Sequence, residues 1–133
     1  MQSRLFGALV TGTFLFLLAA PAWAHHGGAA YDSGTMKTLT GTVTDFQFIQ
    51  PHPLIFLDVK EASGNIEKWY VEMTAPNHLS RYGWTGHKLH AGEVIKVMGN
   101  PARNGNKVLN LRKIFNEDGT EIPLGPPPRP EEN

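Results

Sequence analysis

Apolar and polar residues alternate along most of the chain after residue 35, and a period of two is typical of half-buried β-strands. Turn-forming segments such as Ser63-Gly64-Asn65 and Asn104-Gly105 separate the alternating segments from one another. The pattern therefore predicts strands at residues 36–49, 54–60, 66–73, 94–99 and 107–115, with a short extension at residues 122–124.

The first alternating segment changes phase part of the way along. Leu39 and Val43 share one face of the predicted strand, whereas Phe46 and Phe48 fall on the opposite face. An extra residue on one strand produces such a shift, so we predict a β-bulge at residues 44–45. A bulge there would turn one long strand between two faces of a sheet.

One short helix is predicted between the third and fourth strands. Pro76 suits the first turn of a helix, Leu79 and Tyr82 are spaced by three, and Gly83 suits the C-terminal end. Three strands, a short helix and two strands are the order of elements in an OB-fold. We therefore predict an all-β protein, an OB-like five-stranded Greek-key barrel, and keep a small open sandwich as the alternative.

The same alternation predicts which side chains fill the barrel. Trp69 and the methionines Met36, Met73 and Met98 are of the types with which periplasmic copper carriers on OB-barrels hold Cu(I). However, Trp69 and Met73 alternate as core residues do, and thioethers are common core fillers, so we interpret this set as core packing. The other residues predicted in the core are Leu57, Val59, Val71, Ile95 and Val97.

The first 24 residues have the pattern of a secretory signal peptide. Arg4 precedes an apolar run from Ala8 to Ala20, Pro21 ends the run, and Ala22-Trp23-Ala24 supplies the small-x-small site of signal peptidase. The run is shorter than the roughly 20 residues that cross a bilayer. We predict cleavage after Ala24, export to the periplasm and no stable membrane insertion afterwards.

Composition changes again at both ends of the mature chain. Residues 25–35 are small and polar, which is typical of a flexible N-terminal arm, and residues 125–133 are rich in proline, which is typical of an extended, disordered tail. The barrel domain is therefore predicted at residues 36–124, as the one domain of a 133-residue precursor.

Charge and motifs exclude several functions. The chain has 12 basic and 12 acidic residues, so no basic surplus exists to bind nucleic acid. Cysteine is absent, which excludes disulfides, thiolate metal sites and cysteine nucleophiles. No nucleophile, phosphate-loop or metalloprotease motif occurs, and a solvated sheet face explains Asp58 and Glu72 better than a catalytic pair does. We expect a protein that is not an enzyme, and the oligomeric state stays open.

Several short motifs occur in the order found in a family of small exported bacterial proteins. They are His25-His26, Thr40-Gly41-Thr42-Val43, Pro51-His52, Leu57-Asp58-Val59-Lys60, Pro76-Asn77, Arg81, Gly83-Trp84 and Gly92-Glu93 leading to Gly99. On these residues the chain resembles domain-of-unknown-function family 6152 over roughly residues 25–114. The resemblance implies an exported single-domain protein and transfers no activity. The chain departs from the family pattern at Gly27, where a serine is usual, and at Gln50, where an asparagine is usual.

The candidate chemistry begins at the predicted mature terminus. Cleavage after Ala24 gives His25 a free α-amine, and this amine together with the Nδ1 atom of His25 can chelate Cu(II). A second imidazole, from His26 or His52, would complete a set of three nitrogens. His52 is held between two prolines, and a preorganised ligand loses less entropy on binding. The opposing interpretation is that all three histidines are ordinary polar residues of an arm and a loop.

The remaining histidines, His78, His87 and His90, have no standard zinc spacing and are interpreted as surface residues. The sequence thus favours a small, non-catalytic periplasmic binding module, with copper as the leading ligand and His25, His26 and His52 as its site. The alternative is a metal-free interaction module that docks an envelope protein through the barrel groove or the Pro-rich tail.

Overall fold

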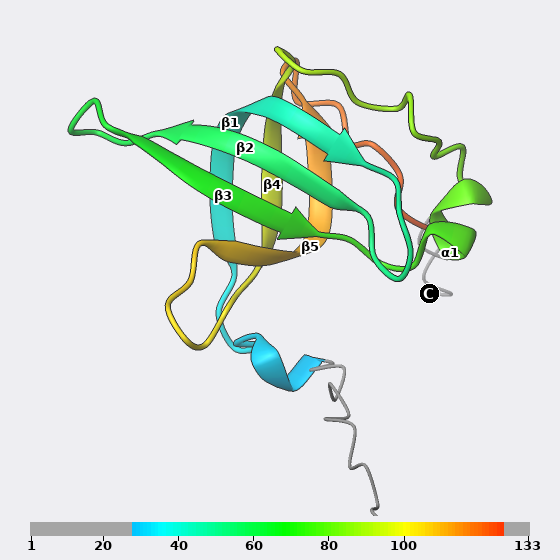
Figure 1. The fold of residues 1–133 in the computed structure, drawn as a ribbon, viewed down its shortest axis with the longest axis horizontal. Coiled ribbons are helices and arrows are strands. Elements are labelled where there is room, and N and C mark those ends of the chain that lie inside the picture. The colour runs from blue at the N-terminus through cyan, green and yellow to red at the C-terminus, as the bar shows by residue number, and fades with distance from the viewer. Residues whose placement is uncertain (1–27, 127–133) are drawn as a thin grey trace, which may run out of the picture.

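Five strands close into one barrel in the computed structural model, which describes residues 28–126. The order around the barrel is β1-β2-β3-β5-β4, with every pair antiparallel except β3 and β5 (Figure 1). This connectivity is that of an OB-fold, so the predicted fold class is confirmed. The elements are η1 (Gly28–Ala30), β1 (Lys37–Gln47), β2 (Leu54–Lys60), β3 (Ile66–Glu72), α1 (Pro76–Ser80), β4 (Val94–Pro101) and β5 (Val108–Asn116).

The bulge predicted in the first strand is confirmed. The register of β1 against β2 shifts between Val43 and Asp45, so Thr44 has no partner on β2. Before the shift β1 pairs with β4, and after it β1 pairs only with β2. The bulge therefore lets one long strand take part in both sides of the barrel, as its curvature in Figure 1 shows.

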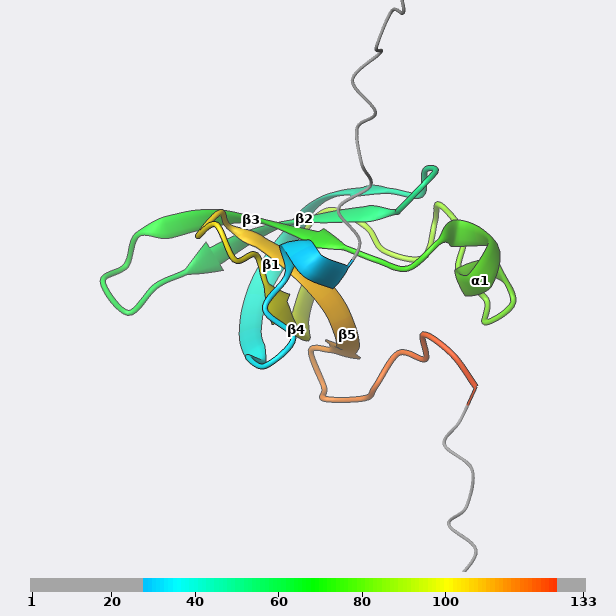
Figure 2. The same cartoon turned by 90° about the horizontal axis from the view of Figure 1, so that it is seen from below.

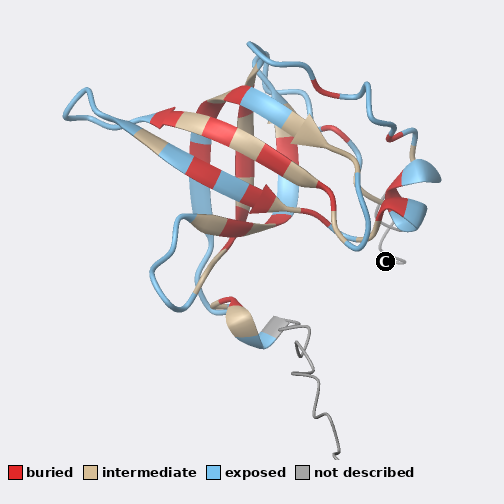
Figure 3. Ribbon diagram, viewed as in Figure 1, coloured by how far each residue is buried: buried red, intermediate tan, exposed pale blue. Residues whose placement is uncertain are grey.

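Alternate residues of every strand point into the barrel, as the banding of buried and exposed residues in Figure 3 shows. The six barrel positions predicted as core are all buried, with Ile95, Leu57, Val71 and Val97 at most 2% exposed. Met36 and Met98 are exceptions to the methionine prediction, and Met98 is only partly buried because it has the outward phase of β4, next to the inward Val97. Met36 lies just before β1 and is 54% exposed, because the inward phase of the strand begins only at Leu39.

The helix α1 lies at the end of the barrel where β3 ends and the β1–β2 loop turns (Figure 2). It is shorter than predicted and ends at Ser80, but the turns that follow reach Gly83, which has a φ of 81°. Trp84 then packs edge-on against Phe46, so this segment plugs one end of the core. The strand extension predicted at residues 122–124 is not formed. The residue before it, Glu121, instead makes an isolated bridge with Phe115.

Strands β4 and β5 approach each other closely at one glycine. A Cβ atom on Gly99 would lie 2.2 Å from the backbone oxygen of Asn110, where the register between the two strands shifts. The next residue, Asn100, is buried and polar. Its side chain donates to the backbone oxygen of Thr35 and accepts from Arg112, so it joins the segment before β1 to β4 and β5.

Residues 28–35 belong to the segment expected to be a flexible arm, but the structure packs them against the barrel. Gly28–Ala30 forms the 3-10 helix η1, and Tyr31 forms a bridge with Ala102 just after β4. The backbone N–H of Asp32 also donates to the oxygen of Pro101. The difference arises because Tyr31, an aromatic residue in a small polar segment, has a place on the barrel where its ring is buried.

Candidate functional site

His52 is the one predicted copper ligand that lies within the described residues; His25 and His26 lie outside them. It lies in the β1–β2 loop beside the buried Pro53, and its side chain is 42% exposed. Its Nδ1 atom is 3.1 Å from the backbone oxygen of Met73. Since a carbonyl oxygen only accepts, Nδ1 carries the proton, and in the neutral ring Nε2 keeps a free lone pair.

Glu72 is the last residue of β3 and faces the same space. Its neighbours Val71 and Met73 point into the core, so Glu72 points out of the barrel. Its Oε1 atom lies 3.7 Å from Nε2 of His52, and its Oε2 atom accepts a hydrogen bond of 2.6 Å from the phenol of Tyr31. The three side chains form a continuous chain of contacts, which we call the Tyr31–Glu72–His52 cluster.

Tyr31 brings the segment before β1 into this cluster. The residue is 8% exposed, and burial together with the neighbouring Glu72 carboxylate raises the pKa of the phenol well above its usual range. The phenol therefore stays a hydrogen-bond donor at all ordinary pH values. The turn that follows is also fixed, because the Thr35 hydroxyl and the Gly34 amide bond to Asp32 and lower the pKa of its carboxyl group.

The cluster offers one imidazole nitrogen and one carboxylate oxygen to a ligand. Within residues 28–126 the structure contains no group of three or more histidine, aspartate or glutamate side chains arranged to hold a metal ion. At this point the described residues therefore offer a metal two donor atoms, Nε2 of His52 and Oε1 of Glu72. The segment before β1 reaches the cluster through Tyr31.

Neither Tyr31 nor Glu72 is among the site residues that the sequence predicts. In the sequence Glu72 stands out only as a possible partner of Asp58 across two strands, and the register contradicts that pairing. Glu72 pairs with Leu54, whereas Asp58 pairs with Lys68 and forms an ion pair with it at 3.0 Å. The available signals were the outward phase of Glu72 and the single aromatic residue of the arm.

The other histidines do not join the cluster. His78 bonds to the backbone oxygen of Leu124, and His90 forms an exposed pair with Glu93, while His87 is exposed in the loop between them. Trp69 and Met73 are buried in the core, as predicted. The Trp69 ring also has the amino groups of Lys37 and Lys107 over it, each at 5.3 Å from the ring centre.

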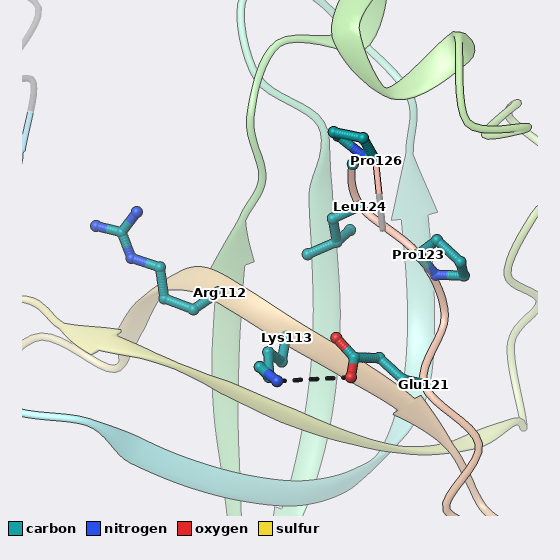
Figure 4. Close-up of a pocket in the computed structure, with 7 residues that line it drawn as sticks. Arg112, Lys113, Glu121, Pro123, Leu124 and Pro126 are labelled. Atoms are coloured by element: carbon teal, nitrogen blue, oxygen red, sulfur yellow. Dashed lines mark ion pairs between the residues drawn. The ribbon is translucent and has the colours of Figure 1, made fainter. Parts of the chain in front are cut away.

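A cavity of about 390 Å³ lies between β5 and the segment that follows it (Figure 4). It shares no residue with the Tyr31–Glu72–His52 cluster. Lys113 and Glu121 in its wall form an ion pair at 3.6 Å, and Arg112 donates to Asn100. Its charged groups therefore already have partners within the protein. The cavity is lined by Arg112, Lys113, Glu121, Pro123, Leu124, Gly125 and Pro126.

The fold and this cluster define a class: a small OB-like barrel in which Tyr31, before β1, is bonded to the outside of β3. The chain belongs to the family described as "Family of unknown function (DUF6152)", whose model matches residues 14–110. No curated protein matches the chain. Among the helices within residues 28–126, none is long and apolar enough to cross a membrane.

Several solved structures are similar in part. TiaS in complex with a tRNA and ATP has a TM-score of 0.47 and 20% identity, over 65% of this chain and 19% of that one. The mitochondrial single-stranded DNA binding protein Rim1 of S. cerevisiae has a TM-score of 0.46 and 8% identity, over 62% and 92%. The N-terminal domain of PriB from Thermoanaerobacter tencongensis has a TM-score of 0.43 and 18% identity, over 68% and 98%. These similarities concern the fold and assign no ligand.

Proposed function

We propose that the secreted protein is a non-catalytic copper-binding module of the periplasm. In this proposal Cu(II) is bound by the α-amine and Nδ1 of His25 and by Nε2 of His52. The observation that supports it is the 2.6 Å hydrogen bond between Tyr31 and Glu72, because it holds the N-terminal segment beside the loop that carries His52.

The length of the chain permits this arrangement. The six residues from His25 to Ala30 can span at most about 20 Å. They lead directly to Tyr31, which is separated from His52 only by the Glu72 side chain. The α-amine of His25 is therefore joined to a point near Nε2 of His52 by only a short length of chain. If the whole segment up to Thr35 were free, that length would be greater.

The donor atoms suit Cu(II). Amine and imidazole nitrogens fit tetragonal Cu(II), whereas Cu(I) prefers thioether sulfur. The hydrogen bond from Nδ1 of His52 to Met73 is the kind of second contact that orients a histidine ligand and leaves Nε2 for the metal. His26 is the alternative source of the third nitrogen, and it would make the site local to the terminus.

The test compares two forms of the protein in a Cu(II) titration followed by electron paramagnetic resonance. One form is secreted and begins at His25; the other carries three extra residues before it. Three are needed because one or two would place a histidine third in the chain, where it forms a new copper chelate with the terminal amine. We expect the extended form to bind at least about tenfold more weakly, which corresponds to about 1.4 kcal/mol.

Equal affinity and an identical spectrum for the two forms would refute the terminal chelate. The variant His52→Ala then identifies the third nitrogen. A weaker site with a changed spectrum assigns it to His52, and an unchanged site leaves the role to His26. The variant His90→Ala is the matched control, since it removes an exposed histidine that also faces a glutamate.

The second candidate function is docking of an envelope protein without metal. One observation favours it: the cavity beside β5 lies where the Pro-rich tail begins. The same Cu(II) titration separates the two functions. If the protein is a docking module without metal, the wild type and the variants His52→Ala and His90→Ala should have the same affinity for Cu(II).

A further inference from the structure

The facing atoms of His52 and Glu72 are held in place but are not bonded to each other. The distance of 3.7 Å from Nε2 to Oε1 is too long for a hydrogen bond. The other polar atom of each side chain is already engaged, Nδ1 with Met73 and Oε2 with Tyr31. In the neutral ring the lone pair of Nε2 faces a carboxylate oxygen, an arrangement that a cation between the two atoms would stabilise.

The gap is slightly wider than the spacing of two neighbouring metal ligands. Bonds from a divalent metal to imidazole nitrogen and carboxylate oxygen are about 2.0–2.2 Å. Two such bonds at the angle of about 90° between neighbouring ligands of tetragonal Cu(II) place the donor atoms about 3.0 Å apart. Nε2 and Oε1 are 3.7 Å apart, so a side-chain rotation that brings them about 0.7 Å closer would let them share an ion.

The backbone segments that carry the two donors are bonded to each other at the end of β3. Glu72 ends β3 in register with Leu54, and the amide of Met73 donates to the oxygen of Pro53 at 3.0 Å. The two backbone segments that carry the donors are thus tied to each other on either side of the gap. Since fixed donors lose little freedom on binding, a chelate here would cost little entropy.

The other histidine–glutamate pair of the described region differs in both respects. His90 and Glu93 lie on an exposed turn, and Nδ1 of His90 is 3.0 Å from Oε1 of Glu93, which is a normal hydrogen bond. No gap remains between them, and their side chains are 66% and 43% exposed. This pair therefore provides the control for a pair that is merely hydrogen-bonded.

We propose that Glu72 is a carboxylate ligand of the metal, so that Nε2 of His52 and Oε1 of Glu72 form a chelate on the barrel itself. The inference rests on the proposed function for the remaining ligands, which come from the terminus at His25. It adds an anionic oxygen to the nitrogen set. Because nitrogen and oxygen donors suit Cu(II) and soft sulfur donors suit Cu(I), the site selects the oxidised ion. Tyr31 is a positioning residue, since it holds the second oxygen of Glu72.

The test uses the secreted protein with its native terminus and the variant Glu72→Gln. Glutamine keeps an oxygen that can accept from Tyr31 and removes the charge that would bind the metal. We expect Cu(II) affinity to fall about ten- to a hundredfold, with a changed paramagnetic resonance spectrum. Binding of Ag(I), which stands in for Cu(I), should change less than twofold. The control Glu93→Gln should leave both ions unaffected, and the melting temperature of each apo-protein verifies that it is folded.

The outcomes separate this inference from the proposed function. If Glu72→Gln binds Cu(II) as the wild type does and the extended terminus weakens binding, the terminal chelate stands and the carboxylate ligand is refuted. If the extended terminus has no effect while Glu72→Gln and His52→Ala both weaken binding, the barrel chelate stands and the terminal one is refuted. If Glu72→Gln is unstable, Glu72→Asp is used in its place. It keeps the charge and draws the carboxylate back by one methylene, and an unchanged spectrum and affinity there would refute the carboxylate ligand.

Discussion

At the scale of single residues, the hydrogen bond between Tyr31 and Glu72 connects the segment before β1 to the outside of β3. The residue is buried, and its phenol donates to a charged oxygen 2.6 Å away. Hydrogen bonds to charged groups contribute more than neutral ones do. This contact therefore combines two roles: it stabilises the barrel, and it ties Tyr31 to the glutamate that faces His52.

We predict that Tyr31→Phe lowers the free energy of unfolding by about 1–3 kcal/mol, because the variant leaves a Glu72 oxygen without its donor. Urea unfolding at neutral pH measures the change. Tyr82→Phe is a suitable control, since its hydroxyl makes no side-chain hydrogen bond within the described residues. A Tyr31→Phe protein as stable as the wild type would contradict the assigned contact.

The raised pKa of Tyr31 gives the same contact a pH dependence. A group whose pKa is higher in the folded state stabilises fully below its unfolded pKa, which is about 10 for tyrosine, and that stabilisation is lost as the pH rises further. The stability difference between wild type and Tyr31→Phe should therefore stay constant up to about pH 9 and shrink progressively as the pH rises above about 10. Urea unfolding of both proteins across this window measures it, and a constant difference would show that Tyr31 does not titrate with folding.

At the scale of elements, the alternation of side chains along β3 places core residues on its inner face and the proposed ligand on its outer face. Trp69 and Val71 point inward and are at most 4% exposed, while Tyr70 and Glu72 point outward and lie at the surface or partly buried. One strand therefore fills the core and presents the ligand that we assign to the metal. A shift of its register by one residue would exchange these two sets of side chains.

We predict that Val71→Asp destabilises the protein by about 3–5 kcal/mol, since it places a carboxylate without a partner in the core. Ile66→Asp is the matched control, because Ile66 begins the same strand and is 54% exposed. Thermal or urea unfolding of the two variants should show a large loss for the first and a small one for the second. Similar losses in both would mean that the inward face of β3 has been assigned incorrectly.

At the scale of the whole molecule, the proposed site depends on processing. The barrel supplies His52 and Glu72, whereas the amine of His25 becomes available only if the chain is cleaved after Ala24. The family model covers residues 14–110 and thus spans this junction, although it assigns no activity. In this proposal metal binding therefore depends on export, because cleavage of the peptide bond after Ala24 creates the α-amine of His25.

We predict that protein isolated from the periplasm begins at His25. Intact mass spectrometry of that material measures the cleavage position directly, and the cytoplasmically expressed precursor serves as the reference mass. A mass that includes Pro21 to Ala24, or the whole leader, would exclude the terminal amine of His25 as a ligand. It would leave the barrel pair of His52 and Glu72 untouched.

The sequence by itself determined the barrel. Alternation with a period of two decides which side chains are buried, and a change of phase between Val43 and Phe46 is enough to place the bulge, since both are local properties of the backbone. For the same reason the inward positions Trp69 and Val71 of β3 and Ile95 and Val97 of β4 could be predicted residue by residue. The ends of elements, the methionines Met36 and Met98, and the packing of residues 28–35 differed from the prediction.

Only the tertiary structure decided the site. Tyr31, His52 and Glu72 are far apart in the sequence, and nothing local specifies that the segment before β1 folds against the end of β3. That contact depends on barrel closure, which brings β3 beside β5 and so places the Tyr31–Ala102 bridge next to Glu72. Contacts between distant segments arise from packing of the whole barrel. The sequence pattern therefore identifies His52 as a candidate ligand but does not identify its neighbours Tyr31 and Glu72.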